Sequence, residues 1–156
     1  MSRPVVSTLE APLLLEAARD AGRRAHAPFA GELHPRDAWA LLHGGEAILV
    51  DVRSAEERSF VGYVPGSLHL PWATGMALAR NPRFVDQLQE MLDRNAVLLL
   101  LCRSGKRSAL AAGAATQIGF ANAFNVREGF EGELDEYGRR GRVDGWRFHG
   151  LPWIQN

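Results

Sequence analysis

The residue types most suited to chemistry gather in one short segment, Cys102-Arg103-Ser104-Gly105-Lys106-Arg107. Cys102 is the only cysteine and Lys106 the only lysine among the 156 residues. A free thiol has a pKa of about 8.5, and neighbouring cations or a helix N-terminus lower it. Gly105 can adopt the positive φ that curls a loop so that its amides face an anion. The segment therefore predicts a thiolate nucleophile at Cys102 beside a site for a small anion.

A buried, unreactive cysteine beside solvated cations is the alternative interpretation of this segment. The position of Cys102 favours the interpretation as a reactive thiol. It directly follows an apolar run, residues 97–101, that is typical of a central strand, and a helical pattern begins just after Gly105. No Asp or Glu occurs between Asp93 and Glu128, so no carboxylate in that window competes for the cations.

Short apolar runs alternate with helical patterns from Gly31 onward, which predicts a parallel α/β sheet in three layers. In open sheets of this class, reactive side chains lie where the strands deliver their C-terminal ends. Two expected strands end in polar residues, one in Cys102 and the other in Asp51 and Arg53. The expected strands are residues 32–34, 47–52, 67–70, 97–101 and 123–126, and helices are expected from Pro35, from Asn81 and after Gly105.

A further helix is predicted before this pattern, from Pro12 to Ala25, with proline in the first turn. It suggests an N-terminal helical extension, residues 1–30, packed on a domain of residues 31–156. Leu13, Ala17 and Ala21 form one apolar face of this helix, with Leu14 and Ala18 beside it. In the helix after Gly105, a stripe of Leu110, Ala114 and Ile118 has mostly small residues beside it, and such a face can lie close against a sheet.

The overall composition excludes several classes of protein. Eighteen Lys and Arg balance eighteen Asp and Glu, which gives no reason to expect nucleic acid or a membrane surface as partner. No stretch reaches the ~20 apolar residues that cross a bilayer, and the N-terminus lacks the apolar block of a secretory signal, so we expect a cytoplasmic protein. A single cysteine cannot form an intrachain disulfide. The five histidines lack the close spacing of a ligand motif, so no metal or cofactor is expected.

The segment from Cys102 to Arg107 resembles the active loop of the rhodanese family of sulfurtransferases, Cys-Arg-x-Gly-x-Arg or Thr. Upstream, residues 51–53 and 62–67 resemble the family's first signature, an Asp-x-Arg followed by Gly-His-Ile-x-Gly-Ala. Downstream, residues 125–130 and 150–153 resemble its closing signature. The resemblance covers roughly residues 32–153. The chain departs from it at Tyr63, in place of histidine, at Glu128, in place of glycine, and by one extra residue between Asp51 and Gly62.

The resemblance implies a five-stranded parallel sheet flanked by helices and a sulfurtransferase reaction without a cofactor. Cys102 would take sulfane sulfur from a donor such as thiosulfate, form a persulfide and pass the sulfur to a thiophilic acceptor, which can be a protein. Asp51 and Arg53 would support the loop. The loop residues that would bind the anionic donor are Arg103, Ser104, Gly105, Lys106 and Arg107.

Two other functions remain open at this point. A sulfur-relay or regulatory module that acts on a protein partner would keep the same cysteine. A phosphatase or arsenate reductase of the same fold would have five residues between its cysteine and its arginine. Only four residues separate Cys102 from Arg107, so this loop is one residue shorter. Outside the loop, Glu56 and Glu57 are expected on a solvated helix face.

Overall fold

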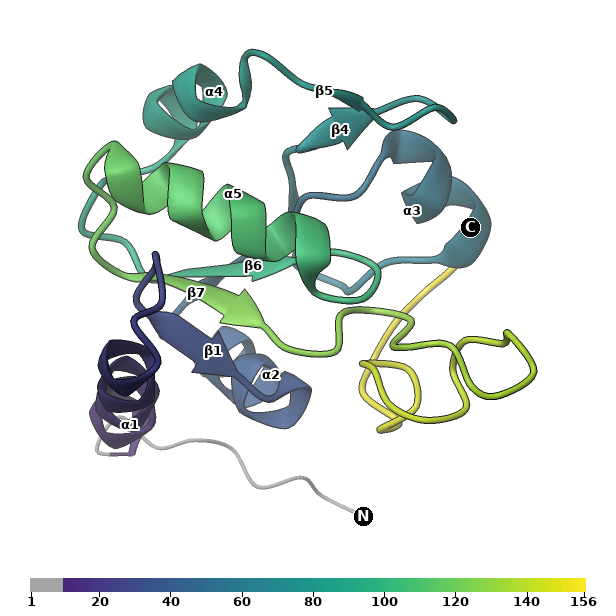
Figure 1. The fold of residues 1–156 in the computed structure, drawn as a ribbon, viewed down its shortest axis with the longest axis horizontal. Helices are drawn as coiled ribbons and strands as arrows, with labels where there is room; N and C mark the ends of the chain where they lie inside the picture. Colours follow the sequence, from purple (N-terminus) through teal and green to yellow (C-terminus); the bar gives the residue numbers. More distant parts are fainter. Residues whose placement is uncertain (1–9) are drawn as a thin grey trace.

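A five-stranded parallel sheet, in the order β1-β7-β6-β2-β3, forms the centre of the molecule (Figure 1). The computed structural model describes residues 10–156. The parallel sheet confirms the α/β fold class expected from the sequence. The strands are β1 (Gly31–Leu33), β2 (Ile48–Asp51), β3 (Leu68–His69), β6 (Leu98–Leu101) and β7 (Ala123–Val126).

Helices cover both faces of this sheet, which gives the expected three layers. Apolar side chains of α1 and α2 pack in one core, and those of α4 and α5 pack in the other. A short antiparallel pair that the sequence did not predict, β4 (Ala73–Thr74) with β5 (Ala79–Arg80), lies beside α3 (Figure 1). The helices are α1 (Ala11–Arg24), α2 (Pro35–His43), α3 (Ala55–Val61), α4 (Phe84–Met91) and α5 (Lys106–Gln117). None of these helices is long and apolar enough to cross a membrane.

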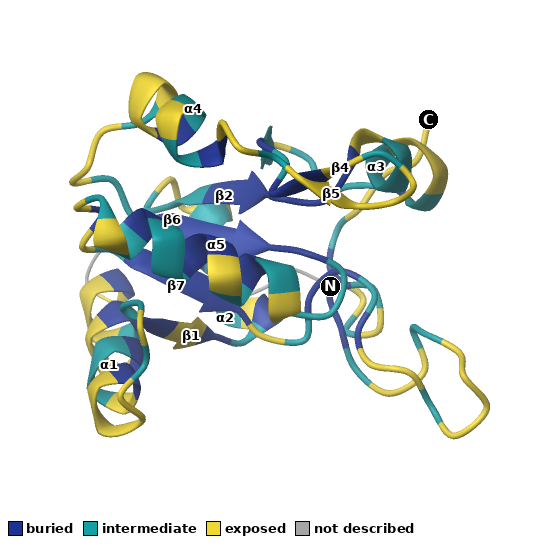
Figure 2. Cartoon of the chain, turned by 45° about the horizontal axis from the view of Figure 1, so that its top comes forward, coloured by how far each residue is buried: buried dark blue, intermediate teal, exposed yellow. Residues whose placement is uncertain are grey.

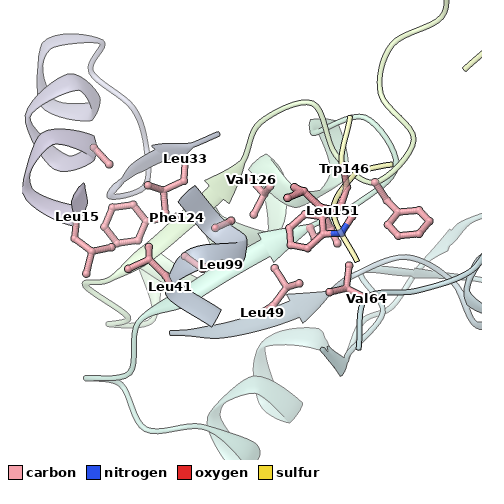
Figure 3. Close-up of a cluster of buried hydrophobic side chains, with 14 of the residues drawn as sticks. Leu15, Leu33, Leu41, Leu49, Val64, Leu99, Phe124, Val126, Trp146 and Leu151 are labelled. Carbon is pink, nitrogen blue, oxygen red and sulfur yellow. The ribbon is translucent and has the colours of Figure 1, made fainter. Parts of the chain in front are cut away.

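The central strand β6 explains why the sheet is covered on both sides. All four of its leucines are fully buried (Figure 2). Leu99 and Leu101 point into the core under α1 and α2, whereas Leu98 and Leu100 point into the core under α4 and α5. Figure 3 shows the first of these cores, where Leu99 lies with side chains of neighbouring strands and of the C-terminal segment. A strand with two apolar faces is stable only at such a central position.

The apolar stripe predicted for α1 is exposed, and the one predicted for α5 is buried only in part. In α1, Leu13 is 68% exposed, and the buried residues are Ala11, Leu15, Ala18 and Gly22. The helix lies so close to β1 that a Cβ at Gly22 would overlap the carbonyl of Ala30, which fixes its rotation. In α5, Leu110 is 62% exposed, whereas Ala114 and Ile118 are partly buried against the core. The small residues beside this stripe are the ones buried against the sheet, Ser108, Ala111, Ala112 and Ala115.

Candidate active site

The ends of β2 and β6 bring the predicted site residues to one edge of the sheet. The two strands pair in parallel, with Asp51 opposite Leu101. Cys102 follows β6 directly, and Arg53 lies two residues beyond the end of β2. The carboxyl ends of parallel strands point the same way, so the cysteine loop and the Asp51–Arg53 pair become neighbours.

The sulfur of Cys102 lies under the loop in a polar environment. Its Sγ accepts a hydrogen bond from the Gly105 amide at 3.1 Å and lies 3.2 Å from the hydroxyl oxygen of Ser108. Gly105 has a φ of +99° and directly precedes α5, so the amide that reaches the sulfur lies at the start of this helix. Cys102 is only 1% exposed. The sulfur therefore lies beneath the surface of the protein and not on it.

A buried polar chain that sequence reasoning missed leads away from the sulfur. The Ser108 hydroxyl lies 2.5 Å from Oδ1 of Asn125, and Nδ2 of Asn125 donates to Glu32 Oε2 at 2.9 Å and to the Gly105 carbonyl at 3.2 Å. Both Ser108 and Asn125 are buried. Since a hydroxyl has one hydrogen, Ser108 donates either to Asn125 or to the sulfur. The signal in the sequence was a single polar residue, Asn125, within an apolar strand.

Arg107 is bound by a carboxylate that was expected in solvent. Its guanidinium donates to both oxygens of Glu57, at 2.7 and 2.8 Å. Glu57 also completes a capping box with Ser54 at the start of α3. The expectation that Glu57 lies on a solvated face was wrong, because α3 places its first turn beside the loop although fifty residues separate the partners. The charge of Arg107 is thus balanced by Glu57.

The ion pair between Arg107 and Glu57 also shifts the pKa values of both groups. Burial raises the pKa of Glu57, but the hydrogen bonds from Arg107 and Ser54 outweigh it and lower the pKa from 4.5 to about 2. The hydrogen bond that Arg107 donates to Glu57 also raises the pKa of Arg107 above its ordinary value. Both groups therefore stay charged across the physiological pH range.

Glu57→Gln is expected to lower the free energy of unfolding by about 2 kcal/mol near pH 7, because it removes the ionic hydrogen bonds and keeps the capping box. The pKa of Glu57 is lower in the folded state, so the contribution of the pair is complete above its unfolded value of 4.5 and disappears as the pH falls toward about 2. Urea unfolding of both proteins across this pH range measures the difference. A difference that stays constant on acidification would contradict the assignment.

The two other loop cations differ in their surroundings. Lys106 is exposed, whereas Arg103 lines a cleft of about 390 Å³ beside the loop. Nε of Arg103 is buried and has no hydrogen-bond partner within residues 10–156. The exposed apolar side chains of Phe60 and Met76 also line the cleft. Its charged lining comprises two arginines and three glutamates, Arg103, Arg140, Glu56, Glu57 and Glu131.

Asp51 and Arg53 form a fully buried ion pair. Arg53 donates from Nε to Oδ1 at 3.0 Å and from Nη2 to Oδ2 at 2.8 Å, and Nη2 also donates to the Gly62 carbonyl at 2.7 Å. Arg58, which sequence reasoning did not single out, adds a hydrogen bond to Asp51 at 2.9 Å, and its guanidinium lies over the ring of Tyr63. This network fixes the end of β2 and the turn after α3.

The segment after β7 connects this ion pair to the cysteine loop. The guanidinium of Arg53 lies 4.3 Å from the ring centre of Phe130, and the Phe130 amide donates to the Cys102 carbonyl at 2.8 Å. The amides of Glu131 and Gly132 both bind the carbonyl of Arg103. Phe130 therefore contacts both the Arg53 guanidinium and the backbone of Cys102.

The chain resembles one described protein family and several individual proteins. Residues 34–135 match the family described as rhodanese-like domain. The crystal structure of Rv0390 from M. tuberculosis is 41% identical, with a TM-score of 0.74, and the match covers 82% of this chain and 99% of that one. The protein RC0915 of Rickettsia conorii is 34% identical over 115 residues, 72% of this chain and 87% of its own length. The thiosulfate sulfurtransferase GlpE of Actinobacillus succinogenes is 28% identical over 121 residues, 78% of this chain and 87% of its own length.

Proposed function

Since the chain belongs to the rhodanese-like domain family, we propose that it is a sulfurtransferase that uses a persulfide on Cys102. The donor is thiosulfate or a similar anion, and the acceptor is thiophilic. One observation carries the proposal: Sγ of Cys102 lies at the end of β6 within hydrogen-bond reach of the Gly105 amide and the Ser108 hydroxyl. The name of the A. succinogenes relative, a thiosulfate sulfurtransferase, supports the same class of reaction.

The reaction proceeds in two displacements at sulfur. The Cys102 thiolate attacks the outer sulfur of thiosulfate, the S–S bond breaks, and sulfite leaves with the bonding electron pair. The acceptor then attacks the outer sulfur of the persulfide, and the thiolate of Cys102 leaves. The same sulfur atom attacks and later departs, so the cycle needs neither a second thiol nor a cofactor. Negative charge stays near Sγ throughout, where the Gly105 amide stabilises it.

The three cations of the loop have different roles in binding the donor. Arg103, which lines the cleft, and the exposed Lys106 bind the oxygens of the anion. Arg107 is held by Glu57, so its main role is to tie the first turn of α5 to α3. Ser104 contributes to the turn, while Ser108 provides the hydroxyl at the sulfur.

Ser108 is expected to turn its hydroxyl according to the charge on the sulfur. Beside a neutral thiol it donates to Asn125, and beside a thiolate it donates to Sγ. Ser108→Ala should therefore lower the rate of persulfide formation by about 10- to 100-fold, the worth of one hydrogen bond to a charged group. Single-turnover kinetics with thiosulfate measure this rate.

Thr116→Ala is the matched control, because it deletes a hydroxyl of the same helix that donates to the Ala112 carbonyl, away from the sulfur. Its rate should stay close to that of the parent chain. The melting temperatures of both variants, measured alongside, separate a lost fold from a lost hydrogen bond. Equal rates for the two variants in folded protein would exclude Ser108 from the reaction.

A protein acceptor is the second candidate, and the exposed apolar side chains that line the cleft favour it. Phe60 is 75% and Met76 86% exposed beside Arg103, which is more apolar surface than a small acceptor needs. Steady-state turnover of thiosulfate with cyanide as acceptor separates the two. Sustained turnover supports a general sulfurtransferase, and a single loading with sulfur followed by slow release supports a relay. Failure to take up sulfur at all would contradict both.

A further inference from the structure

Three side chains outside the sulfur-transfer site converge on one point. Nε2 of His149 lies 2.7 Å from Oε1 of Glu128, and Nε2 of His34 lies 3.5 Å from Oε2 of the same carboxylate. The two imidazole rings are 4.5 Å apart, and all three residues are partly buried. They come from the start of α2, the end of β7 and the C-terminal segment. Because these segments are far apart in the sequence, no spacing motif predicts the cluster.

Glu128 occupies a backbone position that suits glycine. Its φ is +71°, in the left-handed region that a residue with a Cβ adopts at an energetic cost. The carboxylate is nevertheless held in place, since Oε1 accepts hydrogen bonds from the Gly145 amide at 3.0 Å and from His149. Oε2 faces His34 at a longer distance. One carboxylate oxygen is therefore fixed while the other remains available as a ligand.

The three donors favour one class of cation. Two imidazoles and a carboxylate are the donors that divalent transition ions prefer, and they suit Mg²⁺ or Ca²⁺ poorly.

One contact opposes metal binding, and its cost is small. Nδ1 of His34 accepts the amide of Arg36 at the start of α2, which leaves the proton of the neutral ring on Nε2. Ligation through Nε2 would move that proton to Nδ1 and remove this helix cap. The loss of a cap is minor beside the binding of a metal by three protein ligands, and Arg36 is exposed to water that can replace the bond.

We propose that His34, Glu128 and His149 bind one divalent transition ion, with zinc as its best representative. Binding joins Nε2 of both histidines and Oε2 of Glu128 to the ion, and any proton on those nitrogens moves to Nδ1 or to solvent. Water completes the coordination. The ion would link three segments of the chain next to the contacts between residues 129–132 and the cysteine loop. This site is independent of the reaction at Cys102.

Zinc binding to the full chain carrying Cys102→Ser tests the proposal, because the thiol itself would compete for the metal. Native mass spectrometry should show one zinc per chain. Saturating zinc should raise the melting temperature by about 5–10 °C, as expected when the ion exceeds its Kd about a hundredfold. In the same background, His34→Asn keeps a residue that caps helices well, and His149→Asn leaves α2 untouched. Both should abolish the stoichiometric zinc and its thermal shift.

His43→Asn is the matched control, since it alters an exposed histidine of α2 outside the cluster. It should bind zinc like the background protein. Glu128→Gln, which preserves the shape of the side chain, should weaken binding at least tenfold even if a histidine variant folds poorly. An equal thermal shift in the background protein and in folded His149→Asn, or no zinc bound to the background protein, would overturn the proposal.

Discussion

Exchange of Cys102 for serine is expected to abolish sulfur transfer, with a loss of at least about a thousandfold in turnover. A serine hydroxyl cannot form a persulfide and is almost entirely protonated near neutral pH. The change is otherwise conservative, because serine can accept the Gly105 amide in place of the sulfur. Turnover with thiosulfate and cyanide measures the loss.

The fold should survive this exchange, so inactivity can be assigned to the missing sulfur. Cys102 packs among apolar neighbours in the core under α4 and α5, and a serine there should cost about 1–2 kcal/mol in the free energy of unfolding. Circular dichroism and the melting temperature provide the check. Turnover by Cys102→Ser above a few per cent of the parent value would move the chemistry to another residue.

The second large effect concerns stability. Arg53→Met is expected to lower the free energy of unfolding by about 3–5 kcal/mol, because it leaves the buried carboxylate of Asp51 without its main partner. Methionine fills similar space but cannot bind the Gly62 carbonyl or lie as a cation over Phe130. Urea unfolding at fixed pH measures the change.

Arg83→Met is the matched control for this substitution. It breaks an exposed pair, in which Arg83 and Glu90 are 61% and 63% exposed, and should change the free energy of unfolding by less than about 1 kcal/mol. The comparison isolates the effect of burial on an ion pair. Similar losses in both variants would mean that the Asp51–Arg53 pair is no more important than a surface contact.

Much of the fold could be predicted because strand patterns depend on local sequence. The apolar run at residues 97–101 fits only a strand covered on both faces, and β6 is that strand. The pair β4 and β5 was missed because each strand has only two residues, too few for a pattern. The buried face of α1 could not be predicted because a close backbone approach at Gly22, and not the size of the leucines, fixes its rotation.

The site was predictable only in part, for a physical reason. The loop from Cys102 to Arg107 is continuous in sequence, and its meeting with Asp51 and Arg53 follows from the parallel pairing of β2 with β6. The partner of Arg107, in contrast, is set by how α3 packs, and no local pattern marks Glu57 for that role. The cluster of His34, Glu128 and His149 depends in the same way on chain segments that meet only in the folded molecule.

The burial of Cys102 could likewise not be predicted from the sequence, and it limits which reagents can reach the thiol. A residue that is 1% exposed admits a slender anion through the loop more readily than a bulky one. Small alkylating reagents should therefore modify the native protein faster than aromatic disulfides do. The polar partners of the sulfur, the Gly105 amide and the Ser108 hydroxyl, distinguish this position from an inert core cysteine.

The intact mass of the native protein after incubation with thiosulfate tests whether a buried thiol with these partners carries sulfur. We expect the mass to rise by one sulfur atom, to return on addition of cyanide, and to stay constant in Cys102→Ser. An unchanged mass in native protein, with a free thiol that becomes alkylated only after unfolding, would show that Cys102 is a closed core residue and would contradict the account.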